Sequence, residues 1–72
     1  MDQKESDFLH KIGRTVAKTR MEKEFSQDAL ALEANVSRRT IFRLEGGEIN
    51  PRILTLKKIA KALKIDVRDL IK

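Results

Sequence analysis

The stretch from Ser26 to Glu45, SQDALALEANVSRRTIFRLE, constrains the fold more than any other part of the chain. Its apolar residues recur at helical spacing on either side of one break, as Leu30, Ala31, Ala34, Ile41 and Leu44. At the break, Asn35 tolerates the left-handed backbone that reverses a chain after a helix. Ser26 and Ser37 are each placed to cap the helix that follows them. The stretch therefore predicts two short helices joined by a tight turn.

The second of these helices carries three arginines on its outer side, Arg38, Arg39 and Arg43. In the first helix of this pair, the small side chain of Ala31 lets the second helix of the pair cross closely over it. A crossed helix pair whose second member presents arginines to solvent is the sequence form of a helix-turn-helix that enters a DNA major groove. The pattern therefore predicts double-stranded DNA as the partner.

Three more helices are predicted, at about Asp7–Lys23, Arg52–Leu63 and Val67–Ile71. Ser6 is available to cap the first of them and Asp66 the last, and Pro51 stands where the middle one would begin. The pair Gly46-Gly47 would end the helix before it with a left-handed cap. With the helix-turn-helix, these segments predict an all-α domain of five helices.

The apolar positions of these helices form stripes that would face a common core. The stripe of the first predicted helix contains Phe8, Ile12 and Val16, and that of the fourth contains Ile53, Leu56, Ile59, Ala60 and Leu63. The predicted domain spans residues 7–72, with the helix-turn-helix at 26–45. Residues 1–6 are expected to form a flexible tail.

The net charge of +5 is concentrated in the second half of the chain. Residues 1–36 hold six basic and seven acidic side chains, a net charge of −1, whereas residues 37–72 hold ten basic and four acidic, a net charge of +6. A basic half of this kind favours a polyanionic partner, most often nucleic acid. Part of the excess has a plainer explanation as the solvated face of an amphipathic helix, at Lys57, Lys58, Lys61 and Lys64.

Several classes of function are excluded by composition. The 72 residues include no cysteine, which rules out disulfides and thiolate metal sites. His10 is the only histidine, and no carboxylate dyad, metal-ligand spacing or glycine-rich phosphate loop is present. No apolar run reaches membrane-spanning length, and the start MDQKESD does not resemble a signal peptide. We therefore expect a soluble, cytoplasmic protein without enzymatic activity, cofactor, metal or small-molecule ligand.

Taken together, these features resemble the Xre/Cro family of bacterial and phage regulators, whose five-helix domain is shared by lambda-type repressors and restriction-modification controller proteins. The resemblance covers about residues 8–71, and only the joint spacing of its marks is specific. Those marks are Ile12-Gly13, Arg20, Ser26-Gln27, Leu30-Ala31, Val36-Ser37, Ile41, Leu44-Glu45, Gly47, Asn50-Pro51 and Ala60–Leu63. The resemblance implies a sequence-specific regulator of transcription that is associated with the nucleoid through DNA.

The resemblance also assigns roles to single residues. It implies that Arg38, Arg39 and Arg43 read bases, since arginine can donate two hydrogen bonds to guanine O6 and N7, or bind phosphate. Phe42, at a position that is usually polar in the family, would touch thymine methyl groups, or else lie against the first helix or a partner chain. Contacts to phosphate are implied for residues near predicted helix starts, namely Gln27, Ser37, Thr40, Asn50 and Arg52.

Two further positions are implied to be structural. Arg20 and Glu45 match the family positions that form a largely buried ion pair between the first helix and the end of the recognition helix. We therefore interpret neither as a DNA contact. Glu24 stands where glycine is common in the family, between the first two helices, which leaves the geometry of that connection open.

Dimerisation follows from how little one recognition helix can read, about 4–6 base pairs. The resemblance implies a homodimer that places two such helices one helical turn, about 34 Å, apart on a palindromic operator. Candidate dimer residues at the end formed by the fourth and fifth helices are Leu54, Val67 and Ile71. The alternative is an antitoxin or an adaptor whose main partner is a protein. The three outward arginines favour DNA, because an adaptor has no need of them.

Overall fold

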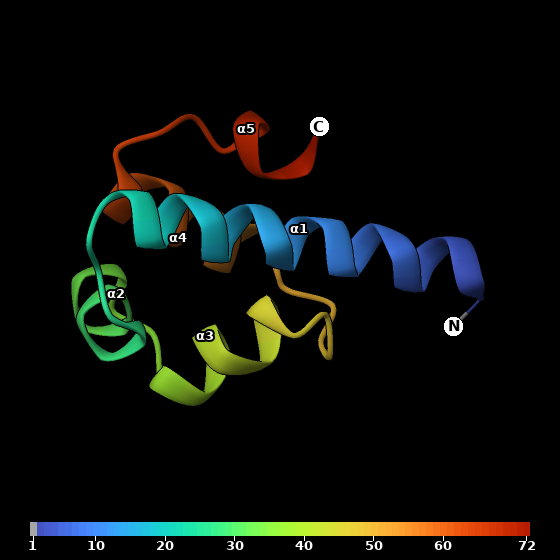
Figure 1. The fold of residues 1–72 in the computed structure, drawn as a ribbon, viewed down its shortest axis with the longest axis horizontal. Coiled ribbons are helices and arrows are strands. Elements are labelled where there is room, and N and C mark those ends of the chain that lie inside the picture. The colour runs from blue at the N-terminus through green and yellow to red at the C-terminus, as the bar shows by residue number, and fades with distance from the viewer. Residues whose placement is uncertain (1) are drawn as a thin grey trace.

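The computed structural model describes residues 2–72, which form five helices and no strands. The helices are α1 (Gln3–Glu22), α2 (Gln27–Ala34), α3 (Arg38–Glu45), α4 (Ile53–Leu63) and α5 (Arg68–Ile71). In Figure 1, α1 runs across the molecule with α2 and α3 on one side and α5 on the other, and α4 lies behind it. Within the described residues, no helix combines the length and apolarity needed to span a membrane. The predicted all-α, five-helix fold is confirmed.

The turn between α2 and α3 forms from the local signals in the sequence. Ser26 Oγ accepts a hydrogen bond from the Ala29 N–H at 3.0 Å and caps α2. Ser37 Oγ accepts one from the Thr40 N–H, also at 3.0 Å, and caps α3. Between them Asn35 is left-handed, with φ 57° and ψ 47°. Each helix of the pair therefore starts and stops on a residue suited to that position.

The first helix begins at Gln3, four residues before its predicted start, so that prediction was wrong. Asp2 caps it instead of Ser6: the Asp2 Oδ1 accepts the Glu5 N–H at 2.8 Å, and the Glu5 carboxylate accepts the Asp2 N–H at 3.1 Å. This reciprocal cap satisfies two N–H groups at once, and a lone serine cap further along cannot do that. Of the predicted flexible tail, Met1 lies outside the described residues, and the residues from Gln3 onward are helical.

The core is apolar throughout, and no buried residue among positions 2–72 is polar or charged. Two predicted core residues lie outside it. Phe8 is 48% exposed, and the next residue, Leu9, takes its place on the buried side of α1. Ile53, the first residue of α4, is 75% exposed, although Leu56 in the same turn is buried. The core consists of Leu9, Ile12, Val16, Leu30, Ala31, Ala34, Ile41, Leu44, Leu56, Ile59, Ala60, Ala62, Leu63 and Leu70.

Gly13 determines how closely α1 crosses α3. A Cβ atom at this position would lie 2.4 Å from the carbonyl oxygen of Leu44 and 2.6 Å from that of Glu45. Only a residue without a side chain allows so close an approach of two backbones. α3 packs against both α1 and α2, and α2 in turn packs against α4. The C-terminal end of α3 is therefore held in one place against the middle of α1.

Left-handed backbone also appears at the connections outside the helix-turn-helix. Glu24, between α1 and α2, has φ 62°, and Lys64, at the end of α4, has φ 59°. After α3 the left-handed residue is Gly47, with φ 71°, whereas Gly46 keeps a right-handed φ of −81°. Glu24 thus adopts a left-handed conformation in the connection whose geometry the sequence left open.

Asp66 stabilises the start of α5. Its Oδ1 accepts the backbone N–H of Arg68 at 2.9 Å, and its two carboxylate oxygens accept hydrogen bonds from the Arg68 guanidinium at 3.0 Å each. The guanidinium bonds, followed by the backbone bond, hold the pKa of the Asp66 carboxyl below its usual value. The side-chain hydrogen bonds to Asp66, followed by the negative charge of its carboxylate, raise the pKa of the Arg68 guanidinium.

Candidate nucleic-acid interface

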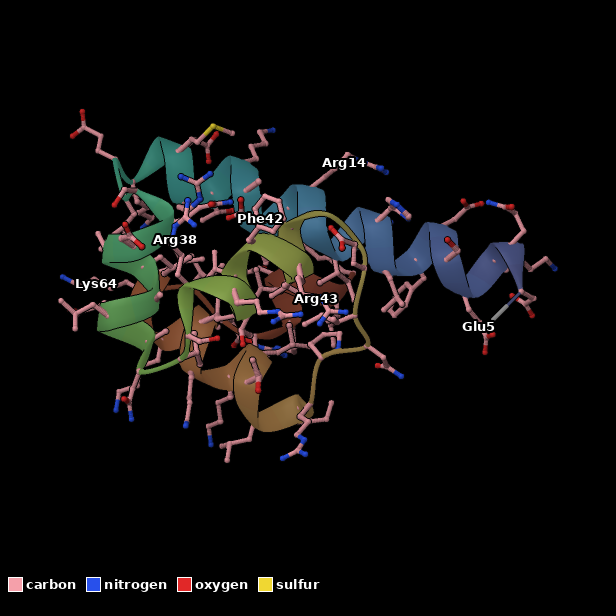
Figure 2. The ribbon with its side chains drawn as sticks, turned by 90° about the horizontal axis from the view of Figure 1, so that it is seen from below. Glu5, Arg14, Arg38, Phe42, Arg43 and Lys64 are labelled. Atoms are coloured by element: carbon pink, nitrogen blue, oxygen red, sulfur yellow. The ribbon has the colours of Figure 1, made fainter. Side chains whose placement is uncertain are left out.

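α3 is anchored by one face and presents the other to solvent. Ile41 and Leu44 point into the core and are 0% and 1% exposed. The four residues predicted to read bases all lie outside the core, with only Arg43 half-buried: Arg38, Arg39, Phe42 and Arg43. In Figure 2, Arg38 lies at the end of α3 next to α2, and Phe42 and Arg43 lie farther along α3. These four side chains are therefore carried by a single short helix whose back is fixed in the core.

Phe42 is the one large apolar side chain of that group. More than half of its surface, 54%, is exposed. Burial in the core therefore does not explain its presence on α3. The exposed ring is available to a thymine methyl group or to a partner chain.

A charged network ties α3 to the first two helices. Arg20 of α1 donates to Glu45 at the end of α3 through Nε–Oε2 at 2.6 Å and Nη2–Oε1 at 3.1 Å. Its Nη1 donates to the carbonyl oxygen of Phe25 at 2.8 Å. Gln27, the first residue of α2, donates from Nε2 to Glu45 Oε1 at 3.0 Å. The structure thus brings Arg20, Gln27 and Glu45 together, although sequence analysis did not pair Gln27 with Glu45.

Arg38, the first residue of α3, lies against the start of α2. Its Nε is 3.1 Å from Oδ1 of Asp28, and the two side chains are 62% and 77% exposed. Sequence analysis missed Asp28. An acidic residue in the first turn of a helix is readily explained by the helix dipole, and nothing in the spacing points to Arg38 as its partner.

Ser37 and Thr40 are linked at the N-terminus of α3. Besides its capping bond, Ser37 Oγ lies 2.8 Å from Thr40 Oγ1, where either hydroxyl can donate. Ser37 is exposed and Thr40 is half-buried. Both hydroxyls therefore lie at the end of α3 where backbone N–H groups favour an anion.

Asn50 and Arg52 precede α4 and are both exposed. Arg52 occupies the N-cap position with extended backbone, φ −70° and ψ 149°, and no side chain among the described residues caps this helix. The first N–H groups of α4 thus lack a side-chain acceptor. A phosphate oxygen is the kind of group that such a helix start accepts.

The three candidate dimer residues differ in exposure. Leu54 is 62% exposed and Ile71 is 38% exposed. Val67 is half-buried and packs against the core. Ile53, beside Leu54, is even more exposed, so the start of α4 presents two adjacent apolar side chains.

The described residues contain no group of three or more histidine, cysteine, aspartate or glutamate side chains that could hold a metal ion. His10 is exposed, and its Nδ1 lies 2.8 Å from the carbonyl oxygen of Ser6. The ring also lies beside Gly47, where a Cβ atom would come within 2.7 Å of it. The His10 side chain, on α1, therefore lies against the loop that follows α3.

Comparison with known proteins gives one family and several similar structures. Residues 16–70 match the model of HTH_3, a helix-turn-helix family. The restriction-modification controller protein C.AhdI from Aeromonas hydrophila is 32% identical, with a TM-score of 0.84 over 86% of this chain and 94% of C.AhdI. An HTH_3-family transcriptional regulator from Vibrio cholerae is 30% identical, with a TM-score of 0.87. The match covers 92% of this chain but only 37% of the Vibrio protein.

A more distant structure shares the fold. The hypothetical transcription factor NHTF from Neisseria has a TM-score of 0.84 at 22% identity, over 93% of this chain and 78% of NHTF. No curated protein sequence matches the chain.

Proposed function

The chain belongs to the HTH_3 family of helix-turn-helix DNA-binding regulators, and we propose that it controls transcription as a dimer at a palindromic operator. It acts by occupying its site in the cytoplasm, on nucleoid DNA, without catalysis. Repression is the simplest consequence of such occupancy. The observation that carries the proposal is the orientation of α3. One face of this helix is buried in the core, and the other face presents three arginines.

Base recognition is assigned to α3. Its N-terminal end, with Arg38 and Arg39, enters the major groove, where an arginine reads guanine through O6 and N7. Arg43, a turn further on, contacts a base or a phosphate, and Phe42 contacts thymine methyl groups. The bonds from Arg20 and Gln27 to Glu45 support this assignment, because they hold the helix rigid behind its reading face.

Phosphate contacts are assigned to the starts of three helices. Gln27 lies at the start of α2, Ser37 and Thr40 at the start of α3, and Asn50 and Arg52 before α4. Helix starts favour anions through their free N–H groups and dipole. One N–H of the Gln27 side-chain amide donates to Glu45, and its second N–H can donate to a phosphate oxygen. Such contacts fix the register of the protein on the duplex without reading sequence.

The dimer is assigned to the end formed by α4 and α5, through Leu54, Val67 and Ile71. The exposed apolar surface of Leu54 and Ile71 supports this assignment. Two recognition helices one helical turn apart, about 34 Å, would read two half-sites of a palindrome. A dimer therefore doubles the sequence information that one α3 provides.

Selection of bound sequences from a random duplex library, with the purified protein at physiological salt, tests the proposal. We expect enrichment of a palindrome with half-sites about 10 base pairs apart. A variant with Arg38, Arg39 and Arg43 changed to alanine should enrich no sequence. The matched control removes the same charge from exposed residues of α1, by changing Lys11, Arg14 and Lys18 to alanine, and should keep the palindrome. Sequence-blind binding by the parent protein, or none, would contradict the proposal and favour an antitoxin or adaptor.

A further inference from the structure

We propose that Asp28 of α2 is a positioning residue for base recognition, which orients the guanidinium of Arg38 so that it reads a guanine. The inference rests on the proposed function, in which α3 enters the major groove. It adds a specificity-determining residue that lies outside the recognition helix.

The geometry of the pair supports this role. Asp28 Oδ1 lies 3.1 Å from Nε of Arg38, the inner nitrogen of the guanidinium. The carboxylate forms an ion pair with the Nε side of the guanidinium, which leaves the two terminal nitrogens free to form a pair of hydrogen bonds to guanine O6 and N7. Figure 2 shows Arg38 at the end of α3 beside α2. Arg38 is the first residue of α3, and the N-terminal residues of a recognition helix are those that contact base edges.

Asp28 is itself held in a fixed place. It follows the Ser26 cap of α2 in the first turn, and Leu30 of the same helix is 0% exposed. The bond from Gln27 to Glu45 fixes this turn to the far end of α3. The carboxylate is therefore carried by a rigid element, whereas the arginine side chain would otherwise choose among many rotamers.

Stability does not account for the pair. Both side chains are mostly exposed, at 62% for Arg38 and 77% for Asp28, and exposed ion pairs contribute little to folding. An arginine that is already oriented before binding loses less rotamer freedom when it meets a base. The advantage of the pair therefore lies in binding, and it concerns the base that Arg38 contacts.

Two simpler roles for Asp28 predict different behaviour. As a first-turn acid it would favour the α2 dipole, so its removal would change stability and leave base preference alone. As a negative charge near DNA it would repel phosphates, so its removal would raise affinity for all sequences alike. A positioning role predicts instead a loss of preference at one base position in each half-site. Base preference and uniform affinity must therefore be measured separately.

The experiment measures the affinity of Asp28→Asn for the selected operator and for operators with each guanine replaced in turn. We expect the preference for one guanine per half-site to fall by roughly 2- to 10-fold, the size expected from ordering one long side chain. Arg38→Ala and Arg38→Lys should lose preference at the same position. Adding Asp28→Asn to Arg38→Ala should cause no further loss there. Asp28→Glu, which keeps a carboxylate in place, should restore part of the preference.

The control is Glu33→Gln, which removes the same charge from the exposed surface of the same helix. It should leave base preference unchanged, and all variants should melt close to the parent protein. The proposal is overturned if Asp28→Asn raises affinity uniformly, leaves preference unchanged, or shifts it at a position other than that of Arg38. If the parent protein selects no sequence at all, the regulator proposal fails first and this inference fails with it.

Discussion

The carboxylate of Glu45 accepts two hydrogen bonds from the guanidinium of Arg20, at 2.6 Å from Nε and 3.1 Å from Nη2. The side chains are only 8% and 14% exposed, and the pair joins the end of α3 to α1 across 25 positions of sequence. Gln27 adds a third hydrogen bond to the same carboxylate. One acidic side chain thus links α1, α2 and α3, and α3 is held at the end opposite to Arg38 and Arg39.

Removing the carboxylate should therefore destabilise the fold. Glu45→Gln leaves the mostly buried Arg20 guanidinium without a counter-charge, and we expect the free energy of unfolding to fall by roughly 3–5 kcal/mol. Urea unfolding followed by circular dichroism measures it. As a control, Asp69→Asn removes the carboxylate of the exposed Asp69–Lys72 ion pair, at a cost of about 1 kcal/mol or less. Equal urea midpoints for Glu45→Gln and the parent protein would contradict the structural role of the pair.

Two glycines should differ strongly in how much stability the same substitution costs. Gly13→Ala would bring its Cβ within 2.4 Å of a backbone oxygen of α3, which cannot move aside. We expect a loss of about 2 kcal/mol or more, despite the higher helix propensity of alanine. Gly46→Ala meets only the flexible carboxylate of Glu48, at 2.8 Å, and its φ of −81° suits any residue. It should change stability by less than about 1 kcal/mol. Thermal melting of both variants measures the difference. If α1 and α3 are not in backbone contact, Gly13→Ala should be the more stable of the two variants.

Glu24 should be improved by replacement with glycine. Its φ of 62° is a left-handed conformation that costs a non-glycine residue about 1–2 kcal/mol. Glycine avoids this cost, but its greater freedom in the unfolded chain offsets part of the gain in stability. We expect Glu24→Gly to gain about 0.5–1 kcal/mol in thermal or urea unfolding. The control, Glu33→Gly inside α2, should lose about 1 kcal/mol, because there the backbone is helical. Destabilisation by both substitutions would mean that Glu24 makes a favourable contact that outweighs its strain.

Local signals explain why the helix-turn-helix could be predicted so closely. Ser26, Asn35 and Ser37 act on their own neighbours, through caps and a left-handed turn, and these need no distant partner. The start of α1 was missed for a related reason, since two local caps competed and the reciprocal one at Asp2 prevailed. A single local signal therefore predicts a boundary, whereas two adjacent candidate caps leave the choice between them open.

Which apolar residues become buried against other helices is harder to predict from their spacing in the sequence. Ile53 lies on the predicted stripe of α4, yet it is 75% exposed, whereas Leu56, three residues farther along the same stripe, is buried. Phe8 and Leu9 are adjacent and both apolar, and their spacing does not decide which of them is buried. The contact between Asp28 and Arg38 likewise depends on how α2 and α3 cross. The Arg20–Glu45 pair was implied by family resemblance alone, since nothing local connects residues so far apart.

The Asp66 carboxyl should titrate below the ordinary value for aspartate. Hydrogen bonds from the Arg68 guanidinium, and then from its backbone N–H, favour the ionised form and lower the pKa. Since the folded-state pKa lies below the unfolded value of about 3.9, the stabilisation is fully present above that value and is lost as the pH falls through the folded pKa. NMR titration of the side-chain carboxyl measures the shift. Arg68→Ala should raise the pKa of Asp66 towards its usual value, whereas Lys72→Ala should leave it in place.

Arg39 and Arg52 should affect DNA binding in different ways. Both are exposed, but Arg39 lies on α3 and Arg52 at the uncapped start of α4. Arg39→Ala should relax base preference and largely keep the dependence of affinity on salt, since a base contact releases no counterions. Arg52→Ala should weaken binding to all sequences alike and reduce the slope of log K against log salt by about 0.9, the value for one phosphate.

Titrations of operator and scrambled duplexes at several salt concentrations separate the two effects, because preference and slope come from the same curves. Arg14→Ala, which removes an exposed arginine from α1, is the control and should change neither quantity. If Arg39→Ala weakens operator and scrambled duplex equally and lowers the slope, Arg39 binds phosphate and not a base. Base reading by α3 would then depend on Arg38, Arg43 and Phe42, which are the other residues of that helix assigned to base contacts.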